Sequence, residues 1–109
     1  MFNSCTSLTY PPKKLPALTL LNTCYGRMFQ GCIKLVETPN ILAEILASDC
    51  CFYMFSGCTN LTKVYKLPAT TLASKCYIYM FSGCTNLLEV PPDLLPATTL
   101  ATTCYGYMF

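Results

Sequence analysis

Apolar residues recur along the chain in a fixed order, at intervals of about 26 residues. The dipeptide Met-Phe occurs at residues 1–2, 28–29, 54–55, 80–81 and 108–109, so its spacings are 27, 26, 26 and 28. Six residues after each of the first four phenylalanines comes a leucine: Leu8, Leu35, Leu61 and Leu87. A repeat of this length cannot bury its apolar face alone, and stacked neighbours share one core. The pattern predicts that these leucines and the neighbouring phenylalanines lie in register inside a common core.

Two kinds of element are expected within each repeat. The pattern Leu-x-x-Val at residues 61–64 predicts a short strand that pairs in parallel with its equivalents in the other repeats. Residues 76–81 predict one or two helical turns, because Cys76, Tyr79 and Met80 fall on one helical face. A glycine follows each predicted helical segment and is expected to have a positive φ. These glycines are Gly31, Gly57 and Gly83.

Composition and charge narrow the range of functions. The chain is 53% hydrophobic, yet charged residues and prolines interrupt every apolar run before it reaches the length of a membrane span. A net charge of +2 is too small to predict a nucleic-acid partner. The chain has no histidine, which is the commonest general base and metal ligand. We therefore expect no enzyme activity, no catalytic residue, no cofactor, no metal and no membrane insertion.

The residue order within one repeat resembles a known family. It runs C-x-x-L-x-x-V-x-x-L-P-x-x-x-L and continues with an aromatic residue, Met-Phe, Gly and Cys. This order resembles the BspA-type leucine-rich repeats of bacterial surface proteins, in a longer form that is richer in cysteine. The resemblance covers essentially the whole chain. It implies an α/β fold, namely a right-handed leucine-rich-repeat solenoid with short parallel strands on one side and short helical turns on the other.

The resemblance also implies a function and a location. It predicts a non-enzymatic adhesion or binding module on the cell surface or in the secreted fraction, with a protein or glycan ligand. Residues 1–109 would form a single solenoid of three full coils plus two half-coils, as a fragment of a longer array, since neither end resembles a polar cap. Uncapped ends also allow self-association. The alternative function is therefore a structural subunit that assembles end to end.

Nine cysteines leave three interpretations open. Reduced cysteine is a small hydrophobe, so two periodic series can form a ladder within the core. A secreted protein would instead favour disulfides across each Cys-x7-Cys unit. Those pairs would be Cys24 with Cys32, Cys50 with Cys58, and Cys76 with Cys84. A metal site is the least favoured, because the spacing is not Cys-x2-Cys.

Charged residues gather around the predicted strand and the loop that follows it. Loops on a rigid scaffold commonly carry binding residues, so this region is the predicted ligand-facing surface. Its residues are Lys13, Lys14, Glu37, Lys63, Tyr65, Lys66, Glu89 and Asp93. Lys75 is placed on the other side of the repeat.

Overall fold

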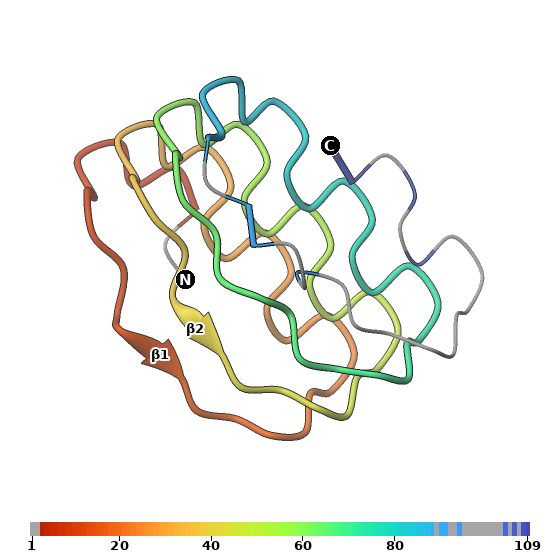
Figure 1. The fold of residues 1–109 in the computed structure, drawn as a ribbon. Helices are drawn as coiled ribbons and strands as arrows, with labels where there is room; N and C mark the ends of the chain where they lie inside the picture. Colours follow the sequence, from red (N-terminus) through yellow and green to blue (C-terminus); the bar gives the residue numbers. More distant parts are fainter. Residues whose placement is uncertain (1–2, 89, 92–93, 95–103, 105, 107) are drawn as a thin grey trace.

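The computed structural model describes residues 3–88, 90, 91, 94, 104, 106, 108 and 109. Segments about 26 residues apart in the sequence lie side by side, as Figure 1 shows. Extended backbone runs along one side of the molecule, and a winding series of turns forms the other. The described chain has its hydrophobic residues between these two sides in one core cluster.

The regular strands are very short. Strand β1 is Lys14–Leu15 and strand β2 is Asn40–Ile41, and the two pair in parallel, Lys14 opposite Asn40 and Leu15 opposite Ile41. Further along the same side, isolated parallel bridges join residue 19 to 45, 45 to 71, and 37 to 63. Pro16 and Pro39 flank these strands and have no N–H to donate, which limits how far each ladder extends.

The turn side follows a regular hydrogen-bonding rule. Between residues 23 and 32, odd-numbered N–H groups donate to the next unit, as Tyr25 does to the carbonyl of Cys50 at 2.8 Å. Even-numbered N–H groups donate three residues back, as Met28 does to Tyr25 at 3.2 Å. The same alternation recurs at residues 49–58 and 76–82. Every second backbone donor therefore ties neighbouring units together, and the buried main chain is satisfied without regular secondary structure.

The predicted helical turns are wrong. No helix is present among the described residues, and residues 76–81 lie in consecutive turns. A helix needs negative φ at every residue, whereas here a positive φ recurs every fourth residue. In the second unit the sequence is Asp49 at 56°, Tyr53 at 52° and Gly57 at 76°. The apolar spacing that suggested a helical face instead reflects this four-residue turn period.

The α/β leucine-rich-repeat solenoid is therefore also wrong as the fold class. The described chain contains two strands of two residues each and no helix, and the molecule is small and compact, with a radius of gyration of 12.4 Å. A domain of this size is expected at about 13 Å. The extended side lacks the continuous strand ladder of that family, and the other side lacks its helices.

The core contains a column of stacked phenylalanines. Phe55 is fully buried between Phe29 and Phe81, with ring centroids 5.3 and 5.6 Å away and planes within 5° of parallel. Leu35 and Leu61 are also fully buried, whereas Leu8 and Leu87 are only partly buried against the same cluster. The predicted burial thus holds completely for the two middle leucines and in part for the outer two.

The predicted positive φ of the glycines is confirmed, with values of 74°, 76° and 79° at Gly31, Gly57 and Gly83. These glycines also stack on one another. A Cβ on Gly83 would lie 3.4 Å from the nitrogen of Gly57, so the neighbouring backbone leaves little room for a side chain.

Candidate functional site

Two adjoining pockets lie on the extended side of the molecule. The larger has a volume of about 480 Å³ and the smaller about 260 Å³. Asn40 and Tyr65 line both, so they form the wall between them. The larger pocket is further lined by Lys63, Val64, Lys66, Val90 and Pro91, and the smaller by Pro11, Pro12, Lys13, Glu37 and Thr38. We call these two hollows the paired pockets.

Parallel pairing between neighbouring units positions the dividing wall. Glu37 and Lys63 form an isolated parallel bridge, and the Thr38 N–H donates to the Lys63 carbonyl at 3.2 Å. Two residues further on, the Tyr65 N–H donates to the Thr38 hydroxyl oxygen at 3.0 Å. Thr38 is only 3% exposed, so this contact fixes Tyr65 to a buried anchor. The wall is therefore preorganised by the main chain.

The side chain of Tyr65 has partners on both neighbouring units. Its hydroxyl donates to Glu37 Oε2 at 3.4 Å, a long hydrogen bond. The Lys63 ammonium lies over the ring, 5.1 Å from its centroid, within the range of a cation–π contact. An anion, a cation and an aromatic ring therefore meet at the boundary of the two pockets.

The structure brings together five of the eight predicted ligand-facing residues. Those five, which line the paired pockets, are Lys13, Glu37, Lys63, Tyr65 and Lys66. Lys14 is exposed and pairs with Asn40 through β1, but it does not line either pocket. Glu89 and Asp93 lie outside the described residues.

Sequence reasoning missed Asn40, which is the residue that the two pockets share with Tyr65. A signal for it was present: Asn40 is opposite Lys14 in the strand register, and Lys66 follows 26 residues later. Two of these three equivalent positions carry lysine and were chosen for their charge. The prolines of the pockets were interpreted only as loop and strand-breaking residues.

The cysteines are all free thiols in the structure. The considered pairs Cys24–Cys32, Cys50–Cys58 and Cys76–Cys84 are thus not joined. Instead, thiols of one unit bond to the main chain of the preceding unit. Cys58 donates to the carbonyl of Phe29 and Cys84 to that of Phe55, both at 3.1 Å. This arrangement corresponds to the core ladder among the three interpretations.

Burial keeps these thiols protonated. It raises the pKa of Cys58 and of Cys76 from the ordinary value of 9.0 to about 12, with neighbouring thiols adding to the shift. It raises the pKa of Cys84 to about 11. The thiolate is the nucleophilic and metal-binding form of cysteine. At neutral pH these three residues therefore behave as apolar core groups.

Two further searches concern metals and membranes. Over the part of the chain that the structure describes, no group of three or more His, Cys, Asp or Glu side chains is arranged to hold a metal ion. Within the same residues, no helix has the length and apolar character needed to cross a bilayer.

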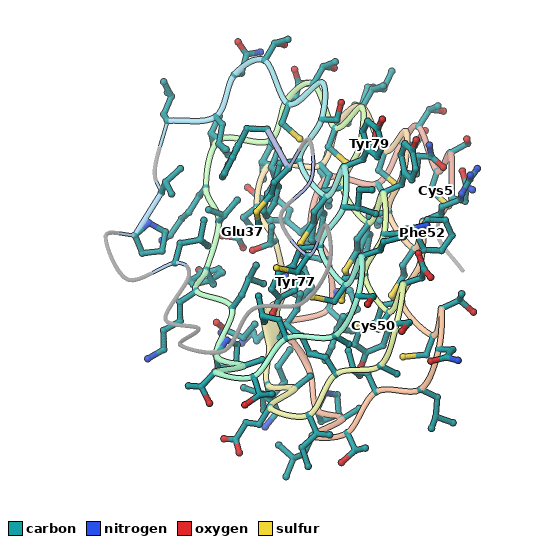
Figure 2. The ribbon with its side chains drawn as sticks, turned by 90° about the vertical axis from the view of Figure 1, so that its right-hand side faces the viewer. Cys5, Glu37, Cys50, Phe52, Tyr77 and Tyr79 are labelled. Carbon is teal, nitrogen blue, oxygen red and sulfur yellow. The ribbon has the colours of Figure 1, made fainter. Side chains whose placement is uncertain are left out.

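The turn side carries aromatic residues, but they pack on one another. Figure 2 shows Phe52 and Tyr79 on the other side of the molecule from Glu37. Tyr53 stacks on Tyr79 with centroids 4.6 Å apart, and the Arg27 guanidinium lies 5.3 Å from the Phe52 ring centroid. No pocket was found beside these rings in the described region, so the paired pockets are the better candidate site.

Comparison with known proteins gives no match: no family model matches the chain, and no curated protein or solved structure does.

Proposed function

We propose that this chain is a non-enzymatic binding module that recognises a macromolecular ligand through the paired pockets. The observation that carries the proposal is the shared wall of Asn40 and Tyr65, with charged side chains on both sides of it. A volume of about 480 Å³ falls within the usual range for ligand sites. Side chains fixed by main-chain contacts lose little freedom on binding, which favours affinity.

The distribution of chemical groups supports binding over catalysis. Catalysis by a nucleophile needs a positioned base and a group that orients the base. The chain has no histidine, and the buried thiols of Cys58 and Cys76 have pKa values of about 12. The paired pockets offer lysines, a carboxylate, an amide and a phenol, which together suit recognition. The resemblance to BspA-type repeats supports a cell-surface or secreted location.

The experiment compares two lysines on different sides of the molecule. Arrays of glycans and peptides are probed with the unaltered chain, with Lys63→Ala and with Lys75→Ala. Both variants lose one positive charge, so they differ in position alone. We expect Lys63→Ala to weaken retention on the arrays and Lys75→Ala to leave it unchanged. Equal losses, or a greater loss for Lys75→Ala, would show that the paired pockets are not the binding surface.

A further inference from the structure

The paired pockets differ in charge, although they share a wall. Lys63 and Lys66 are the charged groups among the described residues of the larger pocket. Lys13 and Glu37 line the smaller one, where their charges offset each other. An anionic group is therefore favoured in the larger pocket, and a neutral polar group in the smaller one. A ligand that fills both has an anionic unit next to a neutral one.

The shape of the site indicates a ligand with several linked units. Two hollows of about 480 and 260 Å³ meet at Asn40 and Tyr65, so an occupant of both must cross this wall. Pro91 and Val90 border one hollow, while Pro11 and Pro12 border the other. Each thus combines an apolar surface with polar groups, which suits sugar rings because a pyranose has apolar C–H faces and polar edges.

The hydrogen-bonding groups on offer favour a sugar over a peptide. A peptide that adds to a sheet edge needs unpaired main-chain groups. Here the N–H groups of Thr38, Asn40 and Tyr65 already donate within the protein, at 3.2, 2.9 and 3.0 Å. The side chains of Glu37 and Asn40 remain as an acceptor and as a combined donor and acceptor beside the wall. Hydroxyl groups can donate to Glu37, whereas the carboxylates of an acidic peptide would be repelled by it.

We propose that the paired pockets bind an anionic polysaccharide, with its charged sugar beside Lys63 and Lys66 and the adjacent neutral sugar beside Lys13 and Glu37. This inference rests on the proposed function and names its ligand class. Lysine is a compact point charge, so the anion can be a carboxylate or a sulfate. The experiment contains one arm for each of these anions.

The test is calorimetric titration of the full chain at two salt concentrations. A hyaluronan tetrasaccharide provides carboxylates and a keratan sulfate tetrasaccharide provides sulfates, each next to neutral sugars. Neutral cellotetraose and an octaglutamate peptide serve as comparison ligands. The variants are Lys63→Met with Lys66→Met, Glu37→Gln, and Lys75→Met as the matched control. Methionine retains a long apolar side chain without the charge, and thermal melts verify that each variant is folded.

We expect at least one anionic tetrasaccharide to bind, and to bind less tightly as salt rises. The double lysine variant should lose at least about tenfold in affinity and most of the salt dependence, because hydrogen bonds to charged groups are the stronger ones. Glu37→Gln should weaken binding while the salt dependence is retained, and Lys75→Met should change neither.

Other results would overturn the inference in distinguishable ways. Octaglutamate bound as tightly as the sugars, with the same loss in the lysine variant, would overturn the polysaccharide and leave the binding module standing. Equal binding of cellotetraose would overturn the anionic subsite. If neither anionic tetrasaccharide binds, the ligand class is wrong, and the array comparison of Lys63→Ala with Lys75→Ala then decides the proposed function separately.

Discussion

Replacing Phe55 with alanine tests the stacked core at its most buried ring. Phe55 is fully buried and has a parallel phenylalanine on each side, at 5.3 and 5.6 Å between centroids. Carbon atoms in contact lie about 3.5–4.0 Å apart, so rings at these separations are offset, which is a favourable aromatic geometry. The substitution removes the ring from two contacts at once and leaves a cavity between two units.

The expected loss is large relative to the stability of the whole chain. Removing a buried phenylalanine side chain costs about 3–5 kcal/mol. A chain of 109 residues typically has a total stability of about 5–16 kcal/mol. Phe55→Ala should therefore remove a large part of the stability. Tyr10→Ala is the control, because this aromatic side chain is 67% exposed and its loss should cost about 0.5 kcal/mol or less.

The assay is equilibrium unfolding in urea, followed by near-ultraviolet tyrosine signals. Because Phe55→Ala can leave the chain unfolded, Phe55→Leu provides a milder change that retains most of the apolar burial. A double-mutant cycle of Phe55→Leu with Phe29→Leu should give a coupling of about 0.5–1.5 kcal/mol from the lost ring pair. A coupling near zero, or equal losses for Phe55→Ala and Tyr10→Ala, would refute the stacked-ring core.

Two further predictions concern the rest of the core. Leu61→Ala should lower the free energy of unfolding by about 2–5 kcal/mol, because Leu61 is fully buried. Thr62→Ala should cost about 1 kcal/mol, since it loses one hydrogen bond to Val36 on a part-buried side chain, and equal losses in urea melts would contradict this register. Burial raises the pKa of Cys58 and Cys76 from 9.0 to about 12, so the unfolded chain releases these protons first as pH rises. Stability should therefore be unaffected by these thiols below pH 9 and fall between pH 9 and pH 12; a chain with both residues replaced by alanine should lose less over that range, and identical pH profiles would contradict the buried thiols.

The sequence contained enough to predict the packing period but not the local backbone. Met-Phe and Leu spacing indicated which residues share the core, and Phe29, Phe55 and Phe81 do stack there. The same spacing cannot distinguish a helical turn from a four-residue turn, because both place residues three and four apart on one face. The decisive feature is the positive φ at Tyr53 and Tyr79, at 52° and 55°. Tyrosine seldom adopts this conformation, so nothing in its identity announces it.

The candidate site shows a similar division. Charge and loop position were sufficient to select Lys13, Glu37 and Lys63 for the binding surface. They were not sufficient to find Asn40, because its place on the wall depends on the parallel register of β1 and β2. Lys14 was selected for its charge, yet it is the partner of Asn40 in that register and lines neither pocket. Only the paired backbone determines which of the two faces the hollows.

The most direct test of the paired pockets as a binding site is an NMR titration with the anionic tetrasaccharides. The side-chain amide of Asn40 gives a signal of its own at the wall that both pockets share. Saturable shifts at this amide and at the backbone amides of Lys63, Tyr65 and Lys66 are the predicted result. Shifts confined to the turn side, around Arg27 and Lys75, or no shifts at any of these positions, would contradict the account.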